Sequence, residues 1–203
     1  MYHLSQSLFL LLMNKFLIVG LGNIGIEYAH TRHNIGFDIV DEFVKKHGGT
    51  FKTERLADVA EVKWKGKIFF CIKPSTYMNL SGRAFKYHLD KEKVELENTL
   101  TIVDDIALPL TKLRLRGSGS DAGHNGLKDI QATMGTDKYS KLRFGIGNDY
   151  KKGMQVDFVL GKWNEIELPL VSKKIEKSIE TIENFAFMGL DRAMNQINNW
   201  EPA

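Results

Sequence analysis

The chain has 203 residues, of which 43% are hydrophobic and 26% are charged, so it is long enough for one well-buried domain and has the composition of a globular protein. Its formal net charge of +3 is too small to mark the whole chain as a nucleic-acid binder, so any such signal has to come from local clusters of cations. The single cysteine, Cys71, lies in an apolar run, which predicts a buried thiol, excludes a disulfide within the chain and fits a reducing, cytoplasmic setting.

The amino-terminal residues do not fit a targeting signal. Leu8 to Met13 is apolar, but no positive residue precedes it, no small-residue cleavage site follows it, and Asn14-Lys15 interrupts it. The run is also too short to span a bilayer. We therefore expect residues 1–12 to be an extension outside the fold and residues 13–203 to form one domain.

The first strong pattern is a continuous apolar run, Phe16 to Val19, that leads into Gly20 and Gly22. Such a run predicts a strand buried on both faces, as in the parallel sheet of an α/β protein. Open α/β sheets bind their ligands at the carboxyl ends of the strands. Four polar residues follow this end closely and indicate a functional site there: Asn23, Tyr28, His33 and Asn34.

Residues 20–25 also match the spacing G-x-G-x-x-G of dinucleotide-binding loops. That motif needs a helix that begins at its last glycines, so that the helix amino terminus faces the pyrophosphate. Here amphipathic helix spacing begins only at Ile35, and the acidic residue expected after a second strand is missing. A nicotinamide-dependent oxidoreductase is thus an alternative that rests on the glycines alone, and we expect no cofactor.

Two further strand ends follow along the chain. Residues 57–64 alternate loosely and predict an edge strand, residues 68–73 predict a central strand, and residues 100–103 predict a third apolar strand. If the strands are parallel, the polar residues beyond their ends face one crevice. These residues are Asn23, Asn79 and Asp104.

Helical patterns fill the spaces between the strands. Ser81 or Asn79 is placed to cap a helix that runs to about Leu89, and a second helix is predicted over 127–134. Apolar residues recur at helical spacing over 166–197, with a break expected near Gly189.

A row of cations opens the second half of the chain. Residues 112–116 alternate with period two, so that Lys112, Arg114 and Arg116 share one face. Such a face is most often solvated, but it is also a candidate strip for phosphate contacts. Other cations of the second half could extend that strip: Lys141, Arg143, Lys151 and Lys152.

His33 carries the most informative chemistry. Imidazole titrates near neutrality and can take a proton from water. Asp104, at a neighbouring strand end, could bond the other ring nitrogen, fix the tautomer and stabilise the imidazolium. No serine or cysteine in the sequence is placed as a nucleophile, so water is the simpler attacker. His30 precedes His33 closely, but no third ligand follows with metal spacing, and we expect no metal site.

Asparagines cannot act as acids or bases, but their amides donate and accept hydrogen bonds at fixed positions. Asn23, Asn79 and Asn125 all stand at predicted strand or helix ends. Any one of them alone is best explained as a loop cap. Three together favour a set that holds a carbonyl, a ribose hydroxyl or the attacking water.

A series of segments in one order carries a resemblance to a known family. They are Gly20 to Asn23, Tyr28 with Thr31 to Gly36, Lys73 to Gly82, Asp104-Asp105 with Leu108-Pro109, Gly123 to Lys128, Arg143 to Gly147, and Phe158 to Gly161. Together they closely resemble the bacterial peptidyl-tRNA hydrolases over about residues 14–197.

The resemblance implies a single three-layer α/β/α domain with a twisted mixed, largely parallel sheet. It also implies a monomer that hydrolyses the ester between a peptide and the 3′ ribose of tRNA and releases tRNA for reuse in translation. Peptidyl-tRNA would be the partner, with no membrane, cofactor or metal involved.

The family's site residues carry over to matching positions of this chain. By resemblance, His33 is the catalytic base and Asp104 is its partner, while Asn23, Asn79 and Asn125 position substrate and water. Tyr28 would lie by the tRNA 3′ end, and Tyr77 and Met78 would line the peptide channel. Independently of the resemblance, the alternating cations Lys112, Arg114 and Arg116, together with Arg143, are the expected tRNA contacts.

The chain departs from the family pattern in three places. Ile24 stands where the family usually has proline, Ala107 stands where an acidic residue is common, and the loop 117–123 carries Ser118, Ser120 and Asp121 among its glycines. We expect none of these to touch the central residues. A non-catalytic RNA-binding relative of the same fold is the remaining alternative, although binding alone does not need a base such as His33.

Overall fold

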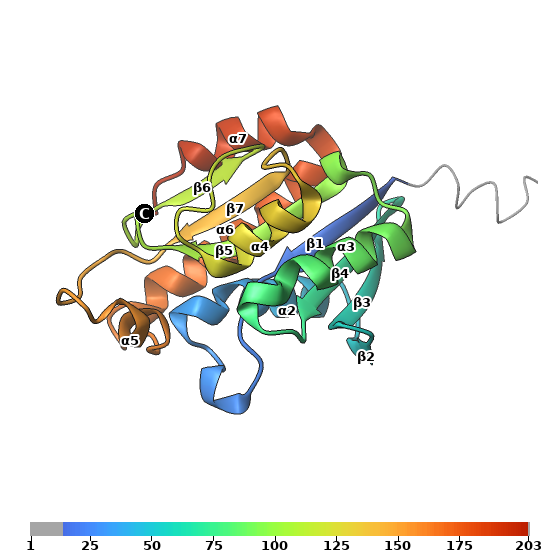
Figure 1. Cartoon of the computed structure of the whole chain (residues 1–203). Coiled ribbons are helices and arrows are strands. Elements are labelled where there is room, and N and C mark those ends of the chain that lie inside the picture. The colour runs from blue at the N-terminus through green and yellow to red at the C-terminus, as the bar shows by residue number, and fades with distance from the viewer. Residues whose placement is uncertain (1–13, 203) are drawn as a thin grey trace, which may run out of the picture.

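The computed structural model describes residues 14–202, and the expected amino-terminal extension, residues 1–12, lies outside the described residues. Seven strands form one sheet in the order β2-β3-β4-β1-β5-β7-β6 (Figure 1). The four consecutive strands β4-β1-β5-β7 run parallel to one another, whereas β2, β3 and β6 pair antiparallel with their neighbours. The sheet is therefore mixed and largely parallel, as expected.

The strands have the following bounds. They are β1 Lys15–Gly20, β2 Lys52–Glu54, β3 Ala57–Trp64, β4 Lys67–Pro74, β5 Thr99–Asp105, β6 Leu113–Arg116 and β7 Ser140–Gly145.

Helices cover both faces of the sheet and complete three layers (Figure 1). One face carries α2 (Ile35–Lys46), α6 (Leu168–Met188) and α7 (Leu190–Asn198), and the other carries α3 (Ser81–Glu92) and α4 (Asn125–Met134). Strand β1 shows why the sheet needs both layers. Its alternate residues Phe16 and Ile18 pack with the first set of helices, and Leu17 and Val19 pack with the second.

The predicted break in the last helical stretch is confirmed. Helix α6 ends at Met188 and α7 begins at Leu190, and between them Gly189 has a φ of 80°, a conformation that favours glycine. In the described part of the chain no helix combines the length and apolar character that a bilayer crossing requires.

Two predicted details at the β2 side of the sheet and at α3 are wrong. Residues 57–64 do form a strand, β3, but it lies inside the sheet because the short polar strand β2 covers its outer side. Neither Asn79 nor Ser81 caps α3, whose side-chain cap comes from another helix. The Gly82 N–H donates to Asp129 Oδ2 of α4 at 2.7 Å.

One short helix has no counterpart in the sequence patterns. Helix α5 (Gln155–Val159) lies beyond the carboxyl ends of the strands, and none of its residues is fully buried (Figure 1). Its 5 residues are too few to show the apolar stripe that would predict a helix.

Candidate active site

The glycines after β1 bring a helix against the strand ends. A Cβ atom on Gly20 would lie 2.2 Å from the Gly36 carbonyl oxygen, and one on Gly36 would lie 2.5 Å from the Ile102 carbonyl oxygen of β5. Any larger residue at either position would push α2 away from β1 and β5. These glycines thus serve helix–strand packing. They set the 3₁₀ turn η2 (Arg32–Asn34), which leads into α2, beside the end of β5.

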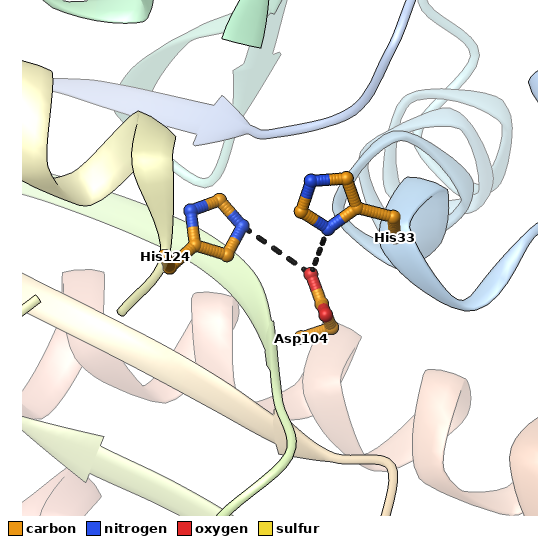
Figure 2. Close-up of side chains that lie close together, drawn as sticks. All are labelled: His33, Asp104 and His124. Atoms are coloured by element: carbon orange, nitrogen blue, oxygen red, sulfur yellow. Dashed lines mark hydrogen bonds and ion pairs between the residues drawn. The ribbon is translucent and has the colours of Figure 1, made fainter. Parts of the chain in front are cut away.

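His33 and Asp104 meet at this point, as predicted (Figure 2). The His33 Nδ1 atom lies 2.8 Å from the Oδ1 atom of Asp104, which is the last residue but one of β5. A carboxylate can only accept a hydrogen bond, so Nδ1 carries the proton of the neutral ring. The lone pair of neutral His33 is then on Nε2, which has no partner among residues 14–202 and can take a proton.

A second histidine, His124, lies on the same carboxylate and was missed in the sequence. Its Nε2 atom is 3.3 Å from Asp104 Oδ1, and its ring centre is 4.8 Å from that of His33 (Figure 2). Its Nδ1 atom accepts from the Gly126 and Leu127 N–H groups at 3.1 and 3.4 Å and so caps α4. Its position directly before Asn125, a predicted site residue, was the feature of the sequence that could have indicated it.

The two histidines fix the charge of Asp104. Burial disfavours the carboxylate, but hydrogen bonds and charge from His124 and His33 outweigh burial and hold the pKa of Asp104 well below its usual range. For His33, burial lowers the pKa, and the hydrogen bond and charge of Asp104 outweigh it, so that the net pKa is raised above 6.5. The site therefore combines a permanent carboxylate with an imidazole that is poised to accept a proton.

The same three side chains also bring metal-binding atoms together. One nitrogen each from His33 and His124 and a carboxylate oxygen of Asp104 lie within 4.8 Å of one another, a cluster that the sequence spacing did not predict. The hydrogen bonds of His124 argue against a cation here. Its Nδ1 atom accepts from backbone N–H groups, so the ring proton sits on Nε2, the atom that a cation between the three side chains would need.

A cavity of about 120 Å³ opens beside these residues. Its walls come from the ends of β5 and β7, the loop before α4, and α5. Besides His33, Asp104 and His124, the lining residues are Asp105, Ile106, Asp121, Ala122, Gly123, Asn125, Arg143, Gln155, Val156 and Val159. Asp121, one of the loop residues that depart from the family pattern, is thus part of the cavity wall.

The predicted asparagines lie at three different places around the site. Asn125 lines the cavity itself, and Asn79 is exposed in the 3₁₀ turn η3 (Met78–Leu80). Asn23 lines a separate hollow of about 400 Å³ with His30 and Lys73 among its walls. Within residues 14–202 none of the three amide side chains has a hydrogen-bond partner, so all remain open to a substrate.

Asn34 orders the loop that carries Asn23. Its Oδ1 atom accepts from the Asn23 N–H at 2.8 Å, and its Nδ2 atom donates to the Asn23 carbonyl at 2.9 Å. We noted Asn34 as a polar neighbour without giving it a role. Because both contacts are to backbone, they leave the Asn23 side chain unoccupied.

The aromatic and sulfur candidates differ in exposure. Tyr77 is 73% exposed, Met78 is 8% exposed, and Tyr28 is half-buried. Met78 packs against the start of α4, since a Cβ atom on Gly126 would lie 2.7 Å from its sulfur. None of the three lines the cavity around His33, and their contacts with substrate stay predictions.

Some cations of the predicted strip are exposed, and others bind carboxylates or backbone carbonyls of the protein itself. In β6, Leu113 and Leu115 are buried while Arg114 and Arg116 are exposed, so the predicted alternation is confirmed. Lys112 forms an ion pair with Glu201. The prediction that Lys141 belongs to a surface strip is wrong, because its side chain is fully buried and donates to the carbonyls of Asp137 and Tyr139.

Arg143 occupies the cavity wall and not the surface of the strip. It is 7% exposed, donates from Nη1 to Asp105 Oδ2 at 3.1 Å, and donates from Nη2 to the Ser120 carbonyl. Its Cα atom pairs with that of Arg114 on β6, so the exposed part of the strip begins beside the cavity. The contact of these cations with tRNA stays a prediction.

Comparisons with known proteins agree with the resemblance. A family model described as peptidyl-tRNA hydrolase matches residues 17–203. The peptidyl-tRNA hydrolase of Phocaeicola vulgatus is 50% identical over 184 residues, which cover 91% of this chain and 98% of that protein. That of Parabacteroides distasonis is 50% identical over 185 residues, with 91% and 99% covered. The crystal structure of peptidyl-tRNA hydrolase from Acinetobacter baumannii superposes with a TM-score of 0.88 at 34% identity and covers 94% of this chain and 97% of that chain.

Proposed function

Because the chain belongs to the peptidyl-tRNA hydrolase family, we propose that it hydrolyses the ester between a peptide and the 3′ ribose of tRNA at the cavity around His33. The observation that carries this assignment is the 2.8 Å contact between His33 Nδ1 and Asp104 Oδ1, which leaves His33 Nε2 open. A neutral imidazole with its second nitrogen held by a carboxylate is the arrangement that a general base needs.

The chemistry follows from the two ring nitrogens. A water molecule beside His33 Nε2 loses a proton to the ring as its oxygen attacks the ester carbonyl carbon. Asp104 stabilises the imidazolium that forms. When the tetrahedral intermediate collapses, the bond to the ribose oxygen breaks, and the imidazolium returns the proton to that oxygen. The products are free tRNA and the peptide acid.

Open amides suit the substrate-binding part of the site. Asn125 in the cavity wall, Asn23 in the separate hollow and Asn79 in η3 would hold the carbonyl, the ribose or the water. Tyr28 would lie by the tRNA 3′ end, and Tyr77 and Met78 would border the peptide. Arg143 in the wall and Lys112, Arg114 and Arg116 on or beside β6 would meet phosphates.

The state and place of action complete the proposal. We propose that the protein acts as a monomer, as the resemblance to the family implies. Peptidyl-tRNA is a product of ribosomes, so we place its action in the cytoplasm. No cofactor or metal is needed for the steps above.

Release of free tRNA from an N-blocked aminoacyl-tRNA tests the assignment. The intact chain should catalyse this release, and His33→Ala should lower the rate by roughly two to four decades while the fold is retained. His30→Ala, a change in the same loop but outside the cavity, is the matched control and should leave kcat unchanged. A His33→Ala variant with more than about a third of the activity would contradict the role of this residue. Binding of tRNA without release by the intact chain would point to a non-catalytic relative.

A further inference from the structure

The residue before the proposed base is anchored far along the chain. Arg32 is 8% exposed, and its Nη2 atom donates to both carboxylate oxygens of Glu167 at 3.0 and 2.7 Å. Its Nη1 atom donates to the Lys162 carbonyl at 2.8 Å. The guanidinium also lies against two aromatic rings, at 4.5 Å from the centre of Phe158 and 5.1 Å from that of Trp163. A buried, forked and stacked arginine of this kind is a rigid connection.

Backbone contacts reinforce this connection. The Arg32 N–H donates to the Gly161 carbonyl at 3.0 Å, and Thr31 forms an antiparallel bridge with Lys162. Glu167 is held in turn, because its Oε2 atom accepts from the Asn164 N–H at 2.8 Å. The loop that carries His33 is thus fastened to residues 158–167 at several points.

The fastened segment begins inside α5, which forms one wall of the cavity. Gln155, Val156 and Val159 of α5 line the cavity, yet α5 has no fully buried residue of its own. Phe158, one turn from Gln155, is where α5 meets the Arg32 side chain. Phe158 and Val159 are only partly buried where they pack against the hydrophobic core, and the buried Arg32 side chain adds an anchor at Phe158. The position of this wall therefore depends in part on Arg32.

We propose that Arg32 is a positioning residue that holds α5 against the site and thereby sets the affinity for the acyl part of the substrate. Two valines and an amide fit an acyl chain with peptide groups and do not fit a phosphate. The inference rests on the proposed function, since it concerns the substrate of that same cavity. His33 itself is held by Asp104, so loss of the Arg32 anchor leaves the base in place.

This division of labour predicts which kinetic constant changes. Wall contacts that are equal in the bound substrate and in the transition state affect KM and leave kcat unchanged. Arg32→Lys keeps the charge but loses the fork and the stacking, and Glu167→Gln keeps the shape but loses the ion pair. Each should raise KM for N-blocked aminoacyl-tRNA by roughly tenfold, with kcat within about twofold of the unchanged protein.

Amide hydrogen exchange gives a second readout that does not depend on turnover. Residues 155–160 should exchange faster in both variants, while the strands β1 and β5 keep their protection. The affinity for an uncleavable analogue, with an amide in place of the ester, should fall in parallel with the rise in KM. If Arg32→Lys does not fold, Glu167→Gln carries the test alone, because it leaves the Arg32 contacts to carbonyls and rings intact.

Glu183→Gln is the matched control. It changes the ion pair of Glu183 in α6 with Lys46 of α2 at 2.6 Å and its contact with His47 at 3.0 Å, both of which lie outside the cavity lining. Its KM and its exchange over residues 155–160 should not change. A loss of kcat at constant KM in Arg32→Lys would show that Arg32 acts through His33. Unchanged kinetics and unchanged exchange would show that Arg32 does not position α5. Either result overturns the inference. Failure of the intact chain to hydrolyse its substrate would refute the proposed function instead, and the exchange and analogue affinity would still test Arg32.

Discussion

His30 and His33 lie on the same loop, and each has an aspartate beside its Nδ1 atom. His30 Nδ1 is 3.1 Å from Asp38 Oδ1, and the two side chains are 79% and 15% exposed. His33 Nδ1 is 2.8 Å from Asp104 Oδ1, and the two side chains are 15% and 4% exposed. The first pair borders the 400 Å³ hollow, and the second borders the cavity with the proposed base.

The two aspartates respond to burial in opposite ways. Burial raises the pKa of Asp38 to about 6, and the charge and hydrogen bond of His30 offset only part of this effect. Burial acts in the same direction on Asp104, but His124 and His33 together keep its pKa well below the usual range. Asp38 therefore takes up a proton on mild acidification, whereas Asp104 stays a carboxylate over the same pH range. The second histidine beside Asp104 is thus one difference between the proposed catalytic pair and the His30–Asp38 pair.

The largest effect is expected when the aspartate of each pair is replaced. Asp104→Asn should lower kcat by roughly three to four decades, because an amide can donate to His33 Nδ1 and so favour the wrong tautomer. Asp38→Asn makes the same chemical change in the other pair and should leave kcat unchanged. Rates of release from N-blocked aminoacyl-tRNA, measured for both variants, provide the check. Equal losses in the two would show that the distinction between the pairs is false.

The pH dependence sharpens the same contrast. His33 acts as a base only when neutral, and Asp104 raises its pKa above 6.5, so kcat/KM of the intact chain should fall as the pH drops through that raised pKa. In Asp104→Asn the raising hydrogen bond and charge are lost while burial, which lowers the pKa, remains. The acidic limb of the residual activity should therefore move to lower pH. A limb that stays in place would mean that it reports another group.

A smaller effect is expected for the asparagine side chains, which have no hydrogen-bond partner within residues 14–202. With an N-blocked substrate, Asn79 or Asn125 would bind the peptide carbonyl or N–H. With a free aminoacyl-tRNA, whose amino group is cationic, the same amide would stay unpaired, at a cost of about 1–3 kcal/mol. Asn79→Ala or Asn125→Ala should therefore reduce discrimination between N-blocked and free aminoacyl-tRNA by roughly ten- to a hundredfold. Ratios of kcat/KM for the two substrates measure this, and Asn195→Ala on the exposed side of α7 is the control. If neither site variant changes the ratio, recognition lies in the backbone.

Much of the fold and of the acid–base pair could be predicted from the sequence. Apolar runs without alternation predicted the buried parallel strands, and polar residues beyond their ends predicted that His33 and Asp104 would meet. This works because parallel strands place their carboxyl ends at one edge of a sheet. The same argument grouped Asn23 with Asn79 and Asp104, but Asn23 lines a different hollow.

Other features depend on contacts that no local pattern reveals. Lys141 alternates with its neighbours like a surface cation, yet it is buried because two backbone carbonyls accept from its ammonium group. His124 looks like a loop residue, and only the folded chain brings it to Asp104. Helix α5 has 5 residues, too few for an apolar stripe, and its Phe158 meets both the core and the Arg32 side chain, which is distant in the sequence.

The smallest effect concerns the exposed cations, at the opposite extreme from the buried pair. Arg114 and Arg116 of β6 have no carboxylate partner in the described part of the chain, and Arg114 stands beside Arg143 of the cavity wall. If they contact phosphates of the acceptor stem, Arg114→Ala and Arg116→Ala should each raise KM for full-length tRNA a few-fold and leave kcat nearly unchanged. Each should also lower the slope of log K against log salt by about one unit.

Two controls separate phosphate contacts from general electrostatics. Lys52→Ala removes an exposed cation from β2, at the opposite edge of the sheet, and should change neither KM nor the salt slope. A minimal substrate, an N-blocked aminoacyl ester of adenosine without the stem, lacks the phosphates in question, so the β6 variants should hydrolyse it like the intact chain. Equal losses on both substrates would instead mean that Arg114 and Arg116 support the fold of the cavity. The charges of β6 would then belong with the buried network around Asp104, and the contrast between a preformed acid–base centre and an exposed tRNA-binding strip would not hold.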